Sequence, residues 1–229
     1  LVWFPGLGAF KGEGNWSSKA QHDLEKKAGD EKLAKSFAKF HNQPIDVIAQ
    51  DAKALTTGKR IFINNCAMCH GSDARGARGF PNLTNSDWQW PNSPDDILTT
   101  LREGRQAAMP ALAGPMESEA GISQVVVYVQ SLSGMQVDPS LAADGKKRFE
   151  GICAACHGID GKGNQALGAP NLTDDVWLYG NEFETMKQTV RAGRNGQMPA
   201  HGAILSDTQI RLVGAYVWSL SHGKKAKTE

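Results

Sequence analysis

The chain has 229 residues, of which 40% are hydrophobic and 21% are charged, and its formal net charge is +1 at pH 7. This is the composition of a globular protein that is long enough to bury a core and to form one or two domains. The balanced charge and the lack of a long Lys/Arg run argue against intrinsic disorder and against a nucleic-acid partner.

The chain opens with an apolar stretch, residues 1–10, that is interrupted at Pro5-Gly6. This stretch is much shorter than the roughly 20 residues of a membrane helix. It has neither an initial Met nor a basic segment, so it is not an intact signal peptide. Two interpretations remain open: an apolar arm packed on its own domain, or the exit of a membrane helix whose body precedes Leu1. The charges of mixed sign from Lys19 to Lys39 predict a solvated face.

All four cysteines lie in two copies of one pentapeptide, Cys-Ala-Met-Cys-His at 66–70 and Cys-Ala-Ala-Cys-His at 153–157. Cys-x-x-Cys followed directly by His is the signature of haem c attachment, in which two thiols add to the haem vinyl groups and the imidazole binds the iron. Zinc would need four ligands around one ion, whereas these pairs lie far apart and each has its own His. A redox dithiol remains an alternative, but it does not explain the features described next.

The motifs therefore predict two haem c groups. The covalent attachments are Cys66, Cys69, Cys153 and Cys156, and the proximal iron ligands are His70 and His157.

Short helices are expected on both sides of each attachment motif. In the first half, Ser93-Pro94-Asp95-Asp96 predicts the start of a helix over 94–103, and its counterpart in the second half is expected over 182–192. A last helix in each half is indicated by apolar residues at helical spacing, around 125–132 and 212–220. Helices this short bury little apolar surface, so we expect the haem to form the centre of each core.

Each half also contains one Met-Pro-Ala segment, at nearly the same distance after its attachment motif. Met109 follows the sequence Arg-Glu-Gly-Arg, and Met198 follows Arg-Ala-Gly-Arg. A thioether is a suitable sixth ligand for low-spin iron and gives a higher potential than a second imidazole. Methionines that fill gaps in a core are the alternative, but the matched repeat positions favour ligation. We predict that Met109 and Met198 are the distal ligands, each within its own half.

The similarity between the halves extends beyond the ligands and indicates a tandem duplication. Gly58-Lys59 and Phe62 recur as Gly145-Lys146 and Phe149, and Pro-Asn-Leu-Thr occurs at both 81–84 and 170–173. The expected organisation is a membrane-exit segment and linker over 1–54, haem domains over 55–134 and 135–222, and a basic tail over 223–229.

Several other polar residues are candidates for contacts with the haem propionates, with surface solvation as the alternative for each Arg. The candidates are Arg75, Arg78, Arg102, Arg105, Arg191, Arg194, Trp88, Trp90 and Trp177. The remaining histidines, His22, His41, His201 and His222, are interpreted as ordinary polar residues. No Ser/His/Asp set or carboxylate dyad is visible, so the sequence offers no case for side-chain catalysis.

With these motifs in this order, the chain resembles the dihaem cytochrome c subunit, CcoP or FixP, of cbb3-type haem-copper oxidases. The resemblance rests on Phe-Pro-Gly-Leu-Gly at 4–8, Phe-Pro-Asn-Leu-Thr at 80–84, both attachment motifs and both Met-Pro-Ala segments. It covers the chain from residue 3 to about 222. One departure is Trp90-Pro91, which stands where the family would have Trp followed by Gly.

The resemblance implies a mainly α fold of two tandem class I cytochrome c domains, preceded by a segment that exits a membrane helix. It implies electron transfer from a periplasmic cytochrome c donor to the monohaem subunit, and from there to the catalytic subunit that reduces oxygen. The haem domains would face the periplasm at the bacterial inner membrane. Two alternatives remain open: a soluble dihaem shuttle of the cytochrome c4 kind, and a dihaem peroxidase or dehydrogenase with one exchangeable iron site.

Overall fold

The computed structural model describes residues 17–222, which form a mainly helical chain with one two-stranded ribbon. The apolar stretch at 1–10, which bears on the membrane-exit expectation, and the basic tail at 223–229 lie outside the described residues. Within the described part, no helix is both long enough and apolar enough to cross a bilayer. The longer helices are α1 (Ser18–Ser36), α3 (Ala52–Asn65), α5 (Pro94–Glu103), α6 (Glu119–Leu132), α7 (Pro139–Arg148), α9 (Phe183–Ala192) and α10 (Asp207–His222).

The shorter elements lie between these helices. They are α2 (Ile45–Ile48), α4 (Ala67–His70), α8 (Ala154–His157), a 3-10 turn (Ala38–Phe40), a π-helical turn (Phe149–Cys153), and the strands β1 (Arg105–Met109) and β2 (Arg194–Met198). The helix expected over 94–103 is confirmed, and the Ser93 hydroxyl accepts a hydrogen bond from the Asp96 N–H at its start. The helix expected over 182–192 begins at Phe183.

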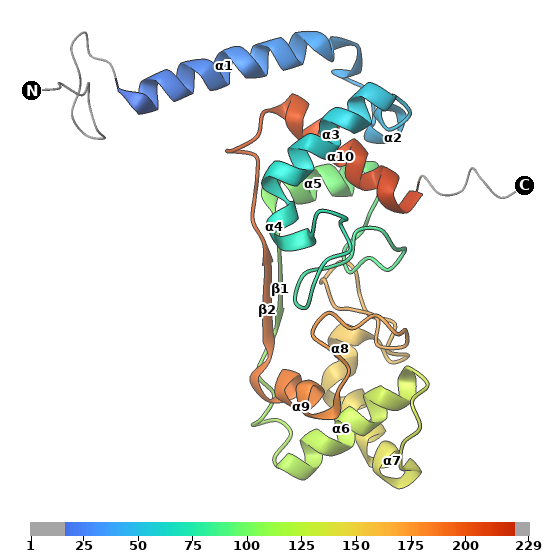
Figure 1. The fold of residues 1–229 in the computed structure, drawn as a ribbon. Coiled ribbons are helices and arrows are strands. Elements are labelled where there is room, and N and C mark those ends of the chain that lie inside the picture. Colours follow the sequence, from blue (N-terminus) through green and yellow to red (C-terminus); the bar gives the residue numbers. More distant parts are fainter. Residues whose placement is uncertain (1–16, 223–229) are drawn as a thin grey trace, which may run out of the picture.

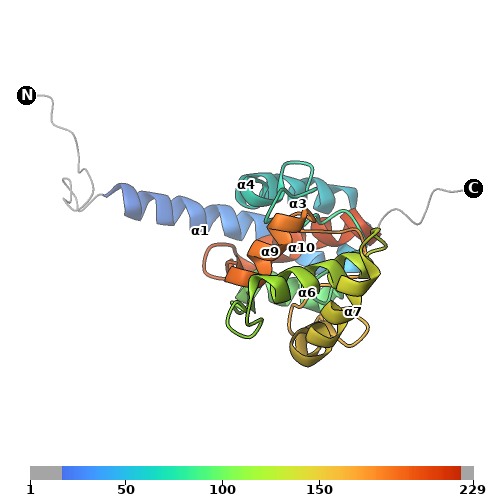
Figure 2. The ribbon, with the colours of Figure 1, turned by 90° about the horizontal axis from the view of Figure 1, so that it is seen from below.

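Helix α1 projects sideways from the body of the molecule (Figures 1 and 2) and has no buried residue. Its 19 residues span about 28 Å. Side-chain pairs one turn apart, Lys19–Asp23 at 2.6 Å and Lys26–Asp30 at 2.8 Å, lie along its surface. The expected solvated face is confirmed, and only the end of α1 approaches the core, through partly buried Leu33 and the buried Phe37 that follows the helix.

The helices form two packed units, one at each end of the molecule (Figure 1). In the first, which we call unit I, α10 packs on α2, α3 and α5. Helices α3 and α10 cross at Gly58, where a Cβ would collide with the carbonyl of Leu212. The closely packed backbones bring Phe62 against Tyr216, with ring centroids 5.5 Å apart. The core of unit I thus combines residues 37–101 with residues 205–217.

The second packed group, unit II, is built in the same way from α6, α7, α8 and α9. Helices α6 and α7 cross at Gly145, where a Cβ would collide with the carbonyl of Gln124, and Tyr128 packs against Phe149 at 5.2 Å. Its core combines Met116 and the apolar face of α6 with Phe149, Met186 and Val190.

The two units are therefore not the two halves of the sequence. The expected domains over 55–134 and 135–222 would have placed α6 on α3 and α10 on α7, but the last helices are exchanged. The exchange is possible because the repeated sequences give both last helices the same kind of apolar face. The segments that lead to the two methionines are extended as β1 and β2, which run antiparallel between the units (Figure 1). Helix α2 also belongs to the core of unit I rather than to a linker.

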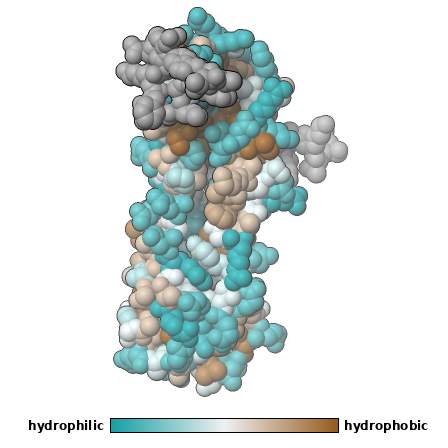
Figure 3. Space-filling view, turned by 60° about the vertical axis from the view of Figure 1, so that its left-hand side comes forward, coloured by the Kyte–Doolittle hydropathy of each residue, from teal (hydrophilic) through white to brown (hydrophobic). Residues whose placement is uncertain are grey.

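The surface between and around the units is mixed in character. The face seen in Figure 3 is mostly hydrophilic, with apolar residues scattered rather than gathered in one band. Scattered apolar residues of this kind are normal for a water-exposed surface.

Candidate haem sites

Each attachment motif folds into a single helical turn. Helix α4 covers Ala67–His70 and α8 covers Ala154–His157, and the first cysteine of each motif is the residue before the helix. The first cysteine of a motif therefore lies three residues before the second cysteine and four before the histidine, and side chains at these spacings are neighbours on a helix. This arrangement would allow one haem to be attached through two sulfurs while the imidazole binds its iron. Helices α4 and α8 lie on the facing sides of the two units (Figure 1).

The hydrogen bonds of the two histidines leave one ring nitrogen available for iron. Nδ1 of His70 lies 3.1 Å from the carbonyl oxygen of Pro81, and Nδ1 of His157 lies 3.1 Å from that of Pro170. A carbonyl oxygen only accepts, so Nδ1 carries the proton and Nε2 is left with a free lone pair. Burial lowers the pKa of both histidines, and the nearby His201 also lowers the pKa of His70. Both rings are thus held neutral, as ligation requires.

The positioning role of Pro81 and Pro170 was not identified from the sequence. The signal that could have revealed it is the repeated Pro-Asn-Leu-Thr segment. In both copies the Asn side chain fixes the loop, because Oδ1 of Asn82 and of Asn171 accepts two hydrogen bonds from the following Thr. The loop then presents the proline carbonyl to the histidine.

The first cysteine of each motif lies in an environment that disfavours a thiolate. Burial raises the pKa of Cys66 and of Cys153 to about 11, and the second cysteine of each motif adds to the effect. A redox-active dithiol requires the opposite shift, which produces a thiolate at neutral pH. All four thiols are unpaired in the structure. The electrostatics therefore argue against a thioredoxin-like pair.

One buried polar atom also fits a bound haem. Nε1 of Trp177 is buried without a hydrogen-bond partner among the described residues, whereas Nε1 of its repeat counterpart Trp88 donates to the carbonyl of Asn85 at 3.2 Å. An indole N–H can only donate, so an unpaired one in a core calls for an acceptor. The carboxylate of a haem propionate is such an acceptor, and the residues present therefore fit the group.

The two predicted distal ligands lie in the β ribbon. Met109 is the last residue of β1 and Met198 is the last residue of β2. Both side chains are partly buried, and Met109 packs against the core of unit II. The strands place each methionine in the unit opposite to the one that the sequence halves predict.

The predicted propionate contacts divide into three groups. Arg102 and Arg191 are already engaged in ion pairs, at 2.6 Å with Asp207 and at 2.5 Å with Glu119. Arg75 and Arg78 are exposed, Arg75 beside Asp73 and Arg78 against the carbonyl of Tyr179. Arg105 and Arg194 are partly buried and occupy matching positions: each donates to a threonine hydroxyl in the preceding helix, and each lies over an aromatic ring, Trp90 at 5.1 Å and Tyr179 at 4.5 Å. Of the six arginines, these two remain the best placed.

The loops that follow the two attachment motifs contact each other. The backbone N–H of Gly79 donates to the carbonyl of Leu178 at 2.7 Å, and the Arg78 guanidinium donates to the carbonyl of Tyr179 at 2.8 Å. The Gln165 amide donates to the carbonyl of Trp88 at 2.7 Å, close to where Trp90 packs against Gly168. The two sites therefore face one another across a layer of loops.

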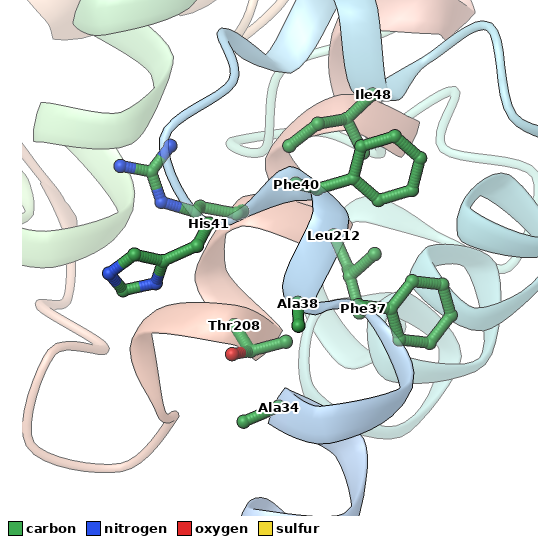
Figure 4. A pocket seen from close by; sticks show the side chains of 9 residues that line it. Ala34, Phe37, Ala38, Phe40, His41, Ile48, Thr208 and Leu212 are labelled. Carbon is green, nitrogen blue, oxygen red and sulfur yellow. The ribbon is translucent and has the colours of Figure 1, made fainter.

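A separate pocket of about 120 Å³ lies between the end of α1 and the start of α10 (Figure 4). It is lined mainly by Phe37, Phe40, Ile48 and Leu212, and His41 lies at its edge. None of its lining residues is a predicted haem ligand. Two other histidines that the sequence analysis interpreted as ordinary polar residues lie near the surface of their helices. His22 is exposed, and His222 is partly buried and stacks on Trp218.

Two helical units, each enclosing a Cys-x-x-Cys-His turn whose histidine has a free Nε2, are the architecture of a c-type cytochrome. A sequence model of the family described as cytochrome c oxidase, cbb3-type, subunit III matches residues 53–129 and 140–217. The chain belongs to this family.

Several known members of this family are similar in sequence to most of the chain. The cbb3-type cytochrome c oxidase subunit CcoP of Rubrivivax gelatinosus is 44% identical over 221 residues, which are 96% of this chain and 72% of the relative. The subunit FixP of Azorhizobium caulinodans is 43% identical over 83% of this chain and 69% of its own length. CcoP of Cereibacter sphaeroides is 41% identical over 80% and 68%. The family transfers electrons on haem c within cbb3-type oxidases, and the predicted family resemblance is confirmed.

Proposed function

We propose that this chain carries electrons on two covalently bound haem c groups, from a periplasmic cytochrome c donor to the monohaem and catalytic subunits of a cbb3-type oxidase that reduces oxygen. The observation that best supports this proposal is the pair of facing attachment turns, each with a neutral histidine whose Nε2 is free. When bound, each haem supplies an iron that exchanges one electron between its ferrous and ferric states.

The residues of the chain would hold the haems and restrict their chemistry. Cys66 and Cys69 would attach one haem and Cys153 and Cys156 the other, while Nε2 of His70 and of His157 would each bind one iron. The sulfurs of Met109 and Met198 would close the distal positions. An iron closed on both faces has no open position for oxygen or peroxide, which favours an electron carrier over a dihaem peroxidase.

The contact between the two haem loops supports internal electron transfer. Hydrogen bonds from Arg78, Gly79 and Gln165 join the loops directly. A fixed separation between two redox groups avoids a diffusional encounter at that step. In this respect the chain suits a relay, with one haem receiving electrons and the other passing them on.

The polar helix α1 supports a location beside a membrane. It is exposed along its length and joins unit I to the apolar stretch at the start of the chain. We propose that residues 1–16 leave a bacterial inner membrane and that α1 holds the haem units away from it on the periplasmic side.

The test is to isolate the full-length protein from host membranes and to measure its haem content, its carbon monoxide binding and the subunits that remain attached. Two covalent haems per chain, both unreactive with carbon monoxide, in a complex with the other oxidase subunits are expected. A free monomer without partners would instead support the soluble shuttle. Rapid carbon monoxide binding at one iron would support the peroxidase or dehydrogenase alternative.

A further inference from the structure

We propose that two small turns, residues 77–80 in unit I and residues 164–169 in unit II, clamp the units together and fix the separation and orientation of the two haems. The positioning residues of this loop clamp are Arg78 and Gln165. The inference rests on the proposed function and deepens it, because it names the residues that hold the haems in place for electron exchange. That exchange oxidises one iron and reduces the other without making or breaking a covalent bond.

Each turn of the loop clamp is connected to the histidine of its own site. A pair of bridged residues closes each turn, Ala77 with Phe80 in unit I and Asn164 with Ala169 in unit II. The next residue in each case is the proline, Pro81 or Pro170, whose carbonyl accepts the histidine Nδ1–H. Any displacement of a turn is therefore passed to the imidazole through the adjoining residue.

The turn of unit I contacts unit II through hydrogen bonds. The Gly79 N–H donates to the carbonyl of Leu178 at 2.7 Å. The Arg78 guanidinium donates twice, from Nε to the carbonyl of Tyr179 at 2.8 Å and from Nη2 to the hydroxyl of Thr185 at 3.2 Å. A guanidinium is planar and its donors have fixed directions, so this contact sets an orientation as well as a distance.

The turn of unit II contacts unit I in return. The Gln165 amide donates to the carbonyl of Trp88 at 2.7 Å, and the Gln89 amide donates to the carbonyl of Gly168. Gly168 is buried with a φ of +64°, and the ring of Trp90 occupies the space that a Cβ would need. Two reciprocal amide hydrogen bonds and one close packing contact thus hold this turn.

The two contacts are related by the sequence repeat. Residues 88–90 of unit I correspond to residues 177–179 of unit II, and each segment receives the turn of the other unit. Arg105 lies over Trp90 and Arg194 over Tyr179 of these segments, so both receiving segments also reach the arginines best placed for the propionates. A reciprocal pair of contacts resists rotation of one unit against the other, which a single contact would permit.

The β ribbon also joins the units, but its geometry does not fix their relative orientation. It consists of two strands and five residue pairs. A ribbon of only two strands is at best marginally stable by itself. We therefore assign to the ribbon the role of a tether and to the loop clamp the role of setting the distance between the haems.

The test measures the distance between the two ferric haems by pulsed electron paramagnetic resonance, in the full-length protein with both haems bound. Arg78→Ala and Gln165→Ala each remove one side of the loop clamp, and the double variant removes both. The matched control is Arg75→Ala, which removes a guanidinium that lies 4.0 Å from Asp73 of its own loop. All three substituted residues are exposed, so the variants are expected to fold. Urea unfolding followed by haem absorption checks this.

The parent and the control should give one narrow distance distribution. The double variant should give a broader distribution with a longer mean distance, and each single variant an intermediate one. Electron exchange between the haems after pulse radiolysis should slow several-fold in the double variant, while both reduction potentials stay unchanged. An unchanged distribution in the double variant, or equal broadening in the control, would overturn the loop clamp and leave the proposed function intact. A parent without two covalent low-spin haems would contradict the proposed function itself.

Two conservative substitutions separate the hydrogen bonds from the loss of a side chain. Gln165→Glu keeps the shape of the side chain, but a carboxylate only accepts, so it loses the bond to the Trp88 carbonyl and should broaden the distribution as Gln165→Ala does. Arg78→Lys keeps the charge without the fixed pair of donors and should give an intermediate result. A Gln165→Glu protein with the distribution of the parent would overturn the positioning role of Gln165.

Discussion

Units I and II are built on the same plan, but unit I surrounds its site more completely. Phe37, Ile45 and Ile48 are buried in unit I, and the described part of unit II has no counterpart to them. His70 is 8% exposed, whereas His157 is only partly buried. A duplicated scaffold can thus give two haem sites with different access to water.

The two units also differ at one matched position close to the predicted distal ligand. The third residue after Met198 is the buried His201, and the third residue after Met109 is the partly buried Leu112. Both backbone N–H groups donate to the last turn of the neighbouring helix, so their environments are equivalent. The polarity beside the proposed iron sites would therefore differ between units whose backbones are alike. Such differences in polarity and burial are a main control of haem potentials.

The largest expected effect comes from removing the helix crossing of one unit. Gly58→Ala should destabilise unit I by about 3 kcal/mol, because the new Cβ collides with the backbone of α10 rather than with a flexible side chain. Gly145→Ala should do the same to unit II. Urea unfolding followed by the absorption of each haem measures the two effects.

The matched control for these variants is Gly29→Ala in exposed α1, where a Cβ meets no atom within 4 Å. It should leave both units unaffected and stabilise the isolated helix by about 0.5–1 kcal/mol. Equal loss of stability in all three variants would contradict the helix crossings described here.

The next effect concerns the distal ligands. Met198→His should keep a low-spin haem but lower the potential of one site by on the order of 0.1 V, because imidazole stabilises ferric iron more than a thioether does. Because the Met198 segment packs on unit I, we expect this change in the haem on Cys66 and Cys69. Redox titration checks it in two backgrounds that keep one haem each, one with Cys153→Ser and Cys156→Ser and one with Cys66→Ser and Cys69→Ser. An unchanged potential in both backgrounds would count against Met198 as a ligand.

A smaller effect is expected from exchanging the polarity of the matched positions. His201→Leu should raise the potential of the unit I haem, because less polar surroundings disfavour the more highly charged ferric state. Leu112→His should lower the potential of the unit II haem for the same reason. Redox titration of both variants would sharpen the comparison between the units, and a shift in the opposite unit would contradict the placement of these residues.

The smallest effect concerns the ion pair at the start of α10. Burial opposes ionisation of Asp207, but hydrogen bonds from Arg102 and Arg211 outweigh it and lower the pKa of this carboxyl. The stability that Asp207 contributes is therefore fully present above its ordinary pKa of 3.8 and is lost as the pH falls through the lower folded-state pKa.

Asp207→Asn should accordingly cost no more than about 1 kcal/mol at neutral pH, as is usual for a partly exposed pair. The cost should disappear at a pH below the folded-state pKa. Urea unfolding of the variant and the parent at both pH values measures the difference. A cost that persists in acid would show that packing, and not the charge of Asp207, stabilises this contact.

The sequence by itself determined the chemistry of the sites. The attachment turns depend on residues that are close in the chain, because a Cys-x-x-Cys-His turn needs only local helix geometry. The repeated Met-Pro-Ala segments likewise identified Met109 and Met198 from the sequence. The helix over 94–103 could likewise be predicted, since its start signal is local.

Only the tertiary structure decided which helices and which methionine belong to each site. Tyr128-Val129 in α6 and Tyr216-Val217 in α10 present nearly the same surface, and both α3 and α7 offer a glycine to receive it. Because the two halves are alike, closed and exchanged pairings bury similar contacts, and local sequence does not distinguish them. The difference lies in residues 105–109 and 194–198, which either turn back within one half or extend and pair with each other. Their pairing as a β ribbon is a long-range interaction, so it was visible only in the folded chain.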